Sequence, residues 1–333
     1  FSQVKGLVYR TKTGELALNE MDRIGEKEGE DMDQINIPDY DFINLDAYIE
    51  GNLRTNTTIR ENAPVWVTRG CPYRCAFCSA PHLNGKPIRT HSVDYMVKWV
   101  KYLYYEKGIR WINIIDDNFT YHVKYAEEFC NRIIELDLKD LKFGTPNGIR
   151  MGRGNLKLWK LMKRAGWDIL IVAPETGSQK VADFMEKDID LQTVPQIVED
   201  IKKADLKVHC FLIIGYPGET VEDLKMTEKM IKENNFNFFG LHRFQPLPGT
   251  PVYDELVEKG EIKDGLLPAN YIEGTSPYVT SGLKDFNFSK FIFKNYLLMA
   301  LRDPMNIPYV LTLFHPNFFI KKFCAHFRQI FNA

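Results

Sequence analysis

The chain has 333 residues, a net charge of −1 and 44% hydrophobic residues, which is ordinary globular composition. This near-neutral balance gives no indication of a nucleic acid or an acidic membrane surface as a partner. The sequence shows neither a secretory signal nor an apolar run of about 18 residues. We therefore predict no transmembrane segment and a cytoplasmic location.

Three regions are predicted from the composition along the chain. Residues 1–60 are polar and irregular, with a strongly charged stretch at 25–33, and are predicted to be a linker. Residues 61–260 alternate short apolar strands with amphipathic helices. Residues 261–333 are helical, aromatic and basic, and are predicted to be a C-terminal helical extension. That extension is either a cap on the central region or a surface for an apolar substrate or a membrane interface.

The central region is predicted to contain six strand–helix units. Strands are expected at 65–68, 111–115, 142–145, 169–172, 207–214 and 238–242. Helices are expected between them at 93–107, 123–136, 156–165, 191–204 and 221–234. Such alternation gives a curled parallel sheet, so the predicted fold class is α/β, a partial (β/α)6 barrel of TIM type. Functional groups of such barrels lie at the carboxyl ends of the strands and in the following loops.

Three of the six cysteines lie within eight residues, directly after the first predicted strand. They are spaced as Cys71-x3-Cys75-x2-Cys78, and the other three are scattered. Clustered thiols in a chain without a secretory signal indicate metal ligands. Three thiolates on an iron–sulfur cluster of four irons would leave one iron open. The alternative, which the spacing alone leaves open, is a zinc site formed by the same cysteines and His82.

This motif after the first barrel strand resembles that of the radical S-adenosylmethionine (SAM) superfamily, and the resemblance extends over about residues 60–260. It implies a [4Fe–4S] cluster on Cys71, Cys75 and Cys78, with SAM at the open iron and Phe77 beside it. It also implies an electron donor such as flavodoxin or ferredoxin. The reduced cluster would cleave SAM to a 5′-deoxyadenosyl radical, which abstracts a substrate hydrogen.

Polar loops after the second and fourth strands agree with this implied SAM site. Asp116, Asp117 and Asn118 follow the second strand, where the family holds the SAM amino group; an N-cap for the next helix is the alternative. Glu175 and Ser178 follow the fourth strand, where the family contacts the SAM ribose; a surface turn is the alternative.

Loops after two other strands carry further candidates. Gly215 and Gly218 follow the fifth strand, where the family lines the adenine and where glycine permits close backbone approach. Asn147 and Arg150 follow the third strand and are predicted either to meet SAM or substrate or to form an ordinary turn. No residue is assigned to catalysis.

These motifs, with Pro-Gly-Thr-Pro at 248–251, resemble the radical SAM subgroup that carries a cobalamin-binding domain. The resemblance implies that residues 1–60 are the tail of a missing cobalamin-type domain. It further implies cobalamin as a cofactor and methyltransferase activity on a carbon of a small-molecule or lipid-like substrate. Two alternatives remain open: a radical SAM cyclase, rearrangement or oxidation enzyme, and a non-catalytic zinc-binding α/β protein.

Overall fold

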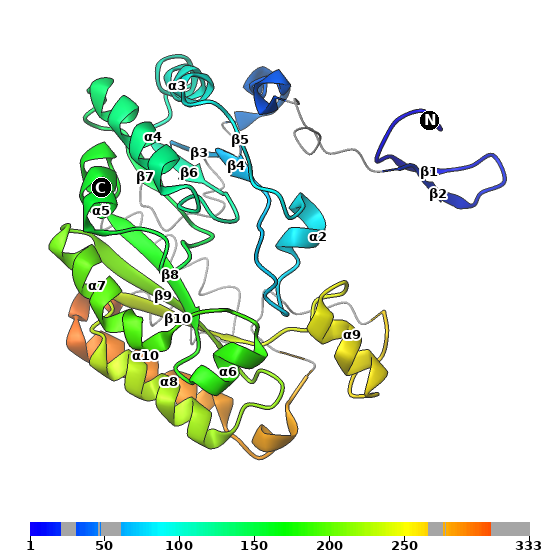
Figure 1. The fold of residues 1–333 in the computed structure, drawn as a ribbon, viewed down its shortest axis with the longest axis vertical. Helices are drawn as coiled ribbons and strands as arrows, with labels where there is room; N and C mark the ends of the chain where they lie inside the picture. The colour runs from blue at the N-terminus through cyan, green and yellow to red at the C-terminus, as the bar shows by residue number, and fades with distance from the viewer. Residues whose placement is uncertain (21–30, 46, 48–60, 266–275, 277, 308–333) are drawn as a thin grey trace.

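The computed structural model describes residues 1–20, 31–45, 47, 61–265, 276 and 278–307. Within them, the hairpin of β1 (Val8–Arg10) and β2 (Leu16–Leu18) lies apart from the main body (Figure 1). In the main body, two parallel sheets lie edge to edge as one curled layer, with helices around it.

Six parallel strands form the centre of the molecule, in two sheets ordered β3-β6-β7 and β8-β9-β10. They are β3 (Asn62–Val65), β6 (Trp111–Ile114), β7 (Lys142–Gly144), β8 (Ile169–Glu175), β9 (Lys207–Ile214) and β10 (Phe238–Arg243). Parallel bridges between Phe143 and Trp167 and between Ile149 and Val172 connect the two sheets. The predicted partial barrel is confirmed, and the described residues include no pairing of β3 with β10 that would close it.

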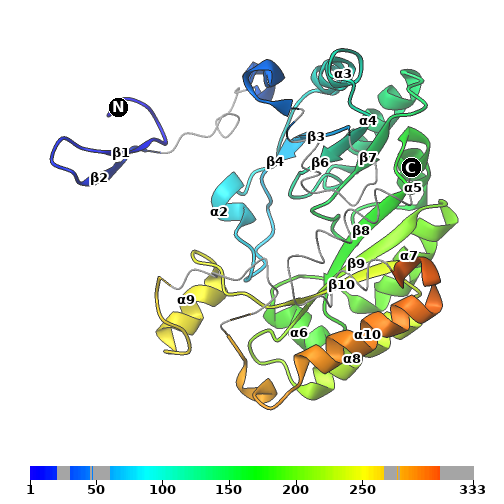
Figure 2. The same cartoon turned by 180° about the vertical axis from the view of Figure 1, so that it is seen from behind.

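Most helices cover the outer side of this sheet, as Figure 1 and Figure 2 show from opposite sides, whereas those at Ala80–Asn84 and Pro251–Glu258 stand apart from that side. Those in the first half are α2 (Ala80–Asn84), α3 (Val93–Lys101), α4 (Val123–Glu135) and α5 (Leu156–Ala165). Those in the second half are α6 (Gln179–Phe184), α7 (Val194–Lys203), α8 (Val221–Glu233), α9 (Pro251–Glu258) and α10 (Phe288–Arg302). The five predicted helices are confirmed, with two changes. The helix predicted at 93–107 is α3 continued by a π-helical turn, η3 (Tyr102–Glu106), and the one predicted at 191–204 begins with a 3-10 turn, η4 (Leu191–Thr193), before α7.

Strand β9 shows how the sheet separates the core from the barrel interior. The side chains of Val208, Cys210, Leu212 and Ile214 point outward and are fully buried beneath the helices. Phe211 and Ile213 alternate with them on the inner side and remain partly exposed. This period of two is what a strand imposes, and it leaves a less crowded surface inside the barrel.

The prediction of a first strand at 65–68 is wrong beyond Val65. Strand β3 ends there, and Thr68 begins a separate short strand, β4 (Thr68–Arg69), which pairs antiparallel with β5 (Arg89–Thr90). The carboxylate of Asp116 accepts hydrogen bonds from the N–H groups of Val67 and Thr68, both at 2.8 Å. A side chain thus satisfies amides that a continuing strand would have paired.

Helix α10 packs against the sheet and against α8. The N–H of Leu241 in β10 donates to the Tyr296 hydroxyl at 2.9 Å, and Arg302 donates to the Ile231 carbonyl at the end of α8. Rings of Phe239 and Tyr296 stack at 5.4 Å. The described part of the C-terminal region therefore covers the barrel as a cap. The aromatic stretch at 308–333, including Cys324, lies outside the described residues.

A short N-terminal segment is tied to the start of α3. The Asp33 carboxylate accepts from the Ser92 N–H at 2.9 Å, and the Tyr95 hydroxyl donates to the Ile35 carbonyl.

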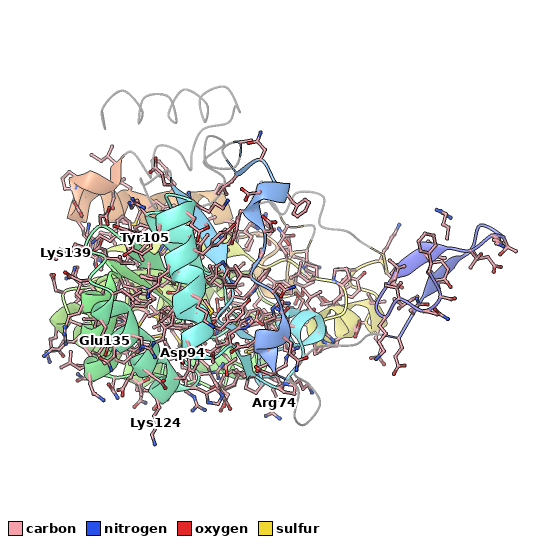
Figure 3. All side chains as sticks on the ribbon, turned by 90° about the horizontal axis from the view of Figure 1, so that it is seen from above. Arg74, Asp94, Tyr105, Lys124, Glu135 and Lys139 are labelled. Atoms are coloured by element: carbon pink, nitrogen blue, oxygen red, sulfur yellow. The ribbon has the colours of Figure 1, made fainter. Side chains whose placement is uncertain are left out.

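Charged side chains such as Lys124 and Lys139 point outward into solvent (Figure 3). Within the described residues, no helix combines the length and the apolar character that crossing a membrane requires.

Candidate functional site

The cysteine loop, residues 70–79, is attached to the rest of the molecule at both ends. The N–H of Cys71 donates to the Gly85 carbonyl at 3.0 Å, and the N–H of Ala76 donates to the Met185 carbonyl at 2.9 Å. These hydrogen bonds hold the loop at the carboxyl end of the barrel.

Gly70 explains how closely this loop lies against its neighbour. It has a φ of +98°, and a Cβ atom at this position would lie 2.1 Å from the Pro87 carbonyl oxygen. Only glycine combines that backbone conformation with that approach. The local geometry therefore requires glycine at position 70, directly before Cys71.

The three thiols of the loop lie within range of each other's charge. Cys75 is 9% exposed, and Cys71 and Cys78 are half-buried. Burial, with smaller contributions from the neighbouring sulfurs, raises the pKa of Cys78 to about 11. Burial also raises the pKa of Cys71 above its usual value, with smaller contributions from Asp117 and Cys75. Iron binding must displace these protons.

The zinc alternative requires Cys71, Cys75, Cys78 and His82 around a single ion. In the part of the chain that the structure describes, no three histidine, cysteine, aspartate or glutamate side chains, those of the three loop cysteines included, surround a position for a single metal ion. His82 lies on α2 with an exposed side chain.

Arg150, after β7, contacts the cysteine loop directly. Its Nη1 lies 3.8 Å from the Cys75 Sγ, and its guanidinium lies 3.5 Å from the centroid of the Tyr73 ring. Asn147 turns the other way, and its Nδ2 donates to the Ile115 carbonyl at 2.7 Å. Of the two polar residues predicted at this loop, Asn147 stabilises the turn and Arg150 belongs to the candidate site.

The two acidic side chains of the loop after β6 accept hydrogen bonds from neighbouring segments. Asp116 is 2% exposed and supports the start of the cysteine loop through Val67 and Thr68, and burial raises its pKa to about 7. Asp117 is half-buried and accepts from the Asn84 side-chain amide at 3.0 Å. None of these residues caps the following helix, because the N-cap of α4 is His122.

Within the described residues, four buried oxygens without a partner lie at the start of β4 and in the segments that follow β6 and β7. They are Thr68 Oγ1, Asn118 Oδ1, Thr120 Oγ1 and Thr145 Oγ1. Buried polar atoms in folded proteins are nearly always hydrogen-bonded. A polar ligand at this edge of the barrel would supply the missing partners, so the residues present fit a bound molecule with donor groups such as SAM.

Glu175 ends β8 in an unusual conformation and forms a buried ion pair. Its φ is +70°, and its carboxylate lies 2.7 Å from the Lys187 ammonium. The two side chains are 10% and 9% exposed. The surface-turn alternative is therefore wrong for Glu175, since this carboxylate is held inside the protein.

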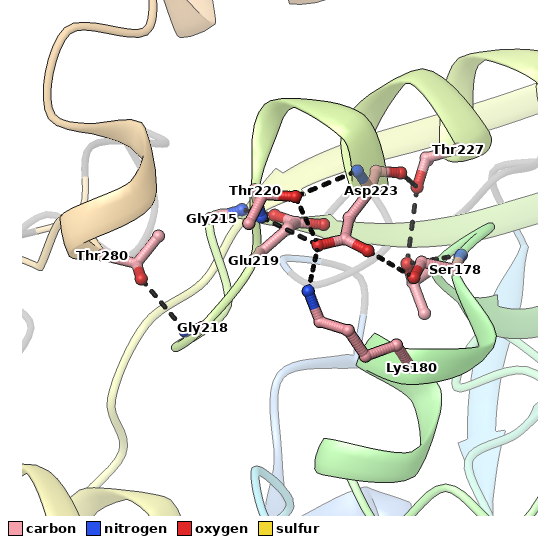
Figure 4. A network of polar contacts seen from close by, with 10 residues as sticks. Ser178, Lys180, Gly215, Gly218, Glu219, Thr220, Asp223, Thr227 and Thr280 are labelled. Carbon is pink, nitrogen blue, oxygen red and sulfur yellow. Dashed lines mark hydrogen bonds and ion pairs between the residues drawn. The ribbon is translucent and has the colours of Figure 1, made fainter.

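Ser178 belongs to a polar network beneath the same loop (Figure 4). Its hydroxyl donates to Asp223 at 2.6 Å, and Asp223 also accepts from Lys180 and Thr220. Burial alone would raise the pKa of Asp223, but the hydrogen bonds from Lys180, Ser178 and Thr220 outweigh it and hold the pKa well below its usual value. The network fixes the loop after β8 to the start of α8.

The loop after β9 contains the two predicted glycines and a buried carboxyl group. Gly215 and Gly218 have φ values of +83° and +77°. The Gly215 N–H donates to Glu219, and the Gly218 N–H donates to the Thr280 hydroxyl at 3.0 Å (Figure 4). Glu219 is fully buried, and this burial raises its pKa to about 8.

Phe77 connects the cysteine loop to these two loops. Its ring meets the Tyr216 ring edge to face at 6.5 Å, and the Lys187 ammonium lies 5.6 Å from its centroid. The predicted residues from the cysteine motif, the β8 end and the β9 loop are thus brought together at one end of the barrel.

Two histidines lie on the interior side of β9 and β10. His209 is 7% exposed, its Nε2 has no partner among the described residues, and burial lowers its pKa to about 4. His242 lies opposite Ile213 and is exposed. The Phe211 ring contacts both imidazoles, at 5.0 and 5.7 Å.

Sequence reasoning missed two residues of this region. Asp223 had a local signal, because it stands three positions after Thr220 in a capping box at the start of α8. Lys187 had no local sequence signal, because the polar stretch around it gives no indication that its side chain is buried against Glu175.

Comparisons with known proteins show which family the chain resembles. An uncharacterised methyltransferase of Pyrococcus horikoshii is 30% identical over 296 residues, 88% of this chain and 61% of that protein. Cytidylyl-2-hydroxyethylphosphonate methyltransferase of Streptomyces wedmorensis is 26% identical over 255 residues, 73% of this chain and 47% of that protein. The chain thus spans about half to two thirds of the length of these curated relatives.

A solved structure shares the fold. The radical SAM methyltransferase TsrM of Kitasatospora setae, solved with cobalamin and a [4Fe–4S] cluster, superposes with a TM-score of 0.64 at 15% identity. The match covers 92% of this chain and 65% of that chain. A family model described as the Radical SAM superfamily matches residues 65–231, half of this chain. The chain belongs to the radical SAM superfamily.

Proposed function

We propose that this chain holds a [4Fe–4S] cluster on Cys71, Cys75 and Cys78 and acts as a radical SAM methyltransferase. The observation that carries the proposal is the cysteine loop itself. Three thiols lie within range of each other's charge on a loop that is fixed at both ends, at the carboxyl end of six parallel strands. Three thiolates leave one of four irons for a further ligand.

SAM would lie between this loop and the ends of β6, β8 and β9. Asn118 Oδ1 has no partner among the described residues and would accept from the SAM ammonium, with Asp117 adding negative charge. Glu175 would face the ribose, and the backbone at Gly215 and Gly218 would line the adenine. When bound, the cluster and SAM together supply a carbon radical that abstracts hydrogen.

Two of the residues predicted to contact SAM, Asp116 and Ser178, instead position neighbouring residues in this proposal. Asp116 is occupied by the amides of Val67 and Thr68, so it positions the loop. Ser178 is occupied by Asp223, so it positions the β8 end. Phe77 would form an apolar wall beside the cluster, since its ring lies between Tyr216 and Lys187.

Methyl transfer to carbon is the proposed outcome, with cobalamin as the methyl carrier. The names of both curated relatives above are those of methyltransferases, which supports methyl transfer as the outcome. The substrate is proposed to be a small or lipid-like molecule that enters the barrel interior beside Phe211 and His242. A flavodoxin or ferredoxin would supply the electron, and the location would be cytoplasmic.

The test is anaerobic reconstitution with iron and sulfide, followed by reduction with SAM in the presence and absence of cobalamin. We expect 5′-deoxyadenosine from the wild type and none from Cys75→Ala. Cys130→Ala is the matched control, because Cys130 is buried within α4 and should leave iron content and cleavage unchanged. Cleavage retained in Cys75→Ala would contradict the assignment of the ligand.

The products separate the remaining alternatives. S-adenosylhomocysteine that forms only with cobalamin supports methyl transfer. 5′-Deoxyadenosine without S-adenosylhomocysteine, in the presence of cobalamin, favours another radical outcome. A colourless protein that binds zinc in place of iron would favour the non-catalytic alternative.

A further inference from the structure

The side chain of Arg150 is buried against the cysteine loop and donates in three directions. It is 9% exposed, although it follows a strand at the open end of the barrel. Nη1 points to the Cys75 sulfur at 3.8 Å, and Nη2 donates to the carbonyls of Lys187 and Asp188, the latter at 2.8 Å. The planar guanidinium therefore bridges the cysteine loop and the segment that carries Lys187.

Tyr73 fixes the orientation of this guanidinium. Its ring lies face-on to Arg150, with 3.5 Å between the guanidinium carbon and the ring centroid. The Tyr73 hydroxyl accepts from Arg153 Nε at 2.9 Å, and Tyr121 meets the ring edge at 5.9 Å. Because the guanidinium is already held in place, its N–H can hydrogen-bond a sulfur with little further loss of side-chain conformational entropy.

The positive charge of Arg150 acts mainly on the cysteine loop. The Asp188 carboxylate approaches it only to 3.9 Å and is 84% exposed, so water screens that pair. Two of its other partners are neutral carbonyls. The Cys75 sulfur lies in a buried setting, where a charge and an N–H donor have a stronger effect than in water.

We propose that Arg150 is a positioning residue that hydrogen-bonds the Cys75 thiolate and raises the reduction potential of the cluster. Reduction adds one negative charge to the cluster and its thiolates. A cationic N–H donor at a ligand sulfur stabilises the reduced form more than the oxidised form, and hydrogen bonds to sulfur are known determinants of cluster potentials. This inference rests on the proposed function, because it takes Cys75 as a cluster ligand.

The same contact couples the cluster to the proposed SAM site. Arg150 holds the carbonyls of Lys187 and Asp188, and Lys187 in turn pairs with Glu175 at the end of β8. One side chain therefore joins the cysteine loop to the turn whose lysine holds the candidate ribose contact. The cluster loop and the β8 end are expected to move together.

The experiment is an anaerobic redox titration of the reconstituted cluster, monitored by electron paramagnetic resonance, without SAM. Wild type, Arg150→Gln, Arg150→Lys and Arg153→Gln are compared after iron and sulfide per chain have been measured. We expect Arg150→Gln to retain iron and to titrate at a more negative potential. Arg150→Lys should shift in the same direction by less, because lysine keeps the positive charge but loses the paired N–H donors of the guanidinium. Arg153→Gln, which contacts the Tyr73 hydroxyl, should shift the potential by clearly less than Arg150→Gln.

Several results would overturn the inference. An unchanged potential in Arg150→Gln would do so, as would an equal shift in Arg153→Gln, which would indicate a general loosening of the loop. Should Arg150→Gln fail to retain iron, Arg150→Lys decides, and an unchanged potential there contradicts the inference. Failure of the proposed function is distinguishable, because Cys75→Ala would then retain its full iron content.

Discussion

The ammonium of Lys187 lies 2.7 Å from the carboxylate of Glu175, and both side chains are about nine-tenths buried. The pair connects the end of β8 to a turn in which Glu186 and Asp188 have positive φ values. Strained backbone of this kind persists where the surroundings hold it in place. Here a buried ion pair is the element that holds the two segments together.

Loss of either charge should therefore destabilise the protein more than loss of both. Lys187→Met leaves a carboxylate alone in a buried site, and Glu175→Gln leaves an ammonium, so each should lower the free energy of unfolding by about 3–5 kcal/mol. The double variant should recover part of this loss. Denaturant unfolding followed by circular dichroism under anaerobic conditions measures all three.

An exposed pair provides the control for this cycle. Lys259 and Glu255 lie one turn apart on α9 with side chains 56% and 58% exposed. Lys259→Met should cost no more than about 1 kcal/mol, because water screens such pairs. Simple additivity of the Lys187 and Glu175 substitutions would contradict the coupling.

Gly70→Ala should impair assembly of the cluster. A Cβ atom at this position would lie 2.1 Å from the Pro87 carbonyl oxygen, so the chain just before Cys71 must move away from its neighbour. We expect iron and sulfide per chain to fall after reconstitution, with the loss measured by chemical analysis and by the cluster absorbance.

Gly260→Ala separates steric clash from backbone strain in that experiment. Gly260 also has a positive φ, of +69°, but within the described residues no atom beyond its two chain neighbours lies within 4 Å of the position of its Cβ. It should lose about 1 kcal/mol of stability and keep its iron. Equal iron content in the two variants would show that the contact with Pro87 does not position the loop.

The sequence predicted the parts of this protein whose causes are local. Helix α5 begins and ends as expected, because Asn155 caps its start and Gly166 adopts the left-handed conformation at its end. The cysteine spacing likewise lies within eight residues. The first strand was placed wrongly because the amides of Val67 and Thr68 bond to Asp116, which lies 49 and 48 positions further along the chain.

The same distinction applies to the candidate site. Ser178 was recognised as part of a loop at the end of a strand, but its hydroxyl partner, Asp223, is 45 positions away. Lys187 is buried only because the turn after α6 brings it back to Glu175. Roles that depend on which loops meet at the barrel end could not be predicted from local pattern, whereas the type of chemistry could.

Asp223→Ala should loosen the joint between α6 and α8. The carboxylate accepts from Ser178, Lys180 and Thr220, and it closes the capping box of α8. Loss of a cap and of a buried hydrogen bond should together lower the free energy of unfolding by about 2–3 kcal/mol. The pair with Lys180 adds little to this value, because that lysine is 46% exposed.

The adjacent residue is the control for this substitution. Glu222 is in the same helical turn, with a side chain 71% exposed, and Glu222→Gln should change stability by less than about 1 kcal/mol. Both variants are compared with wild type by denaturant unfolding. A loss for Asp223→Ala no larger than that for Glu222→Gln would contradict the structural role of the network.

Glu219 should make the protein less stable as the pH rises. It is fully buried in the loop after β9, and burial raises its pKa to about 8 from an ordinary value of 4.5. Between these two values the folded state keeps a proton that the unfolded state releases, so the free energy of unfolding falls with increasing pH. The stabilising effect is complete below pH 4.5 and is lost as the pH passes 8, with an upper limit of about 5 kcal/mol.

Glu219→Gln removes this titration and keeps an acceptor for the Gly215 N–H. The difference in unfolding free energy between wild type and Glu219→Gln should therefore fall steadily from pH 5 to pH 9. Glu233→Gln, at an exposed position near the end of α8, should follow the wild-type curve at every pH. Parallel curves for wild type and Glu219→Gln would mean that Glu219 is already ionised within the folded protein, and that the loop after β9 admits water to its carboxyl group.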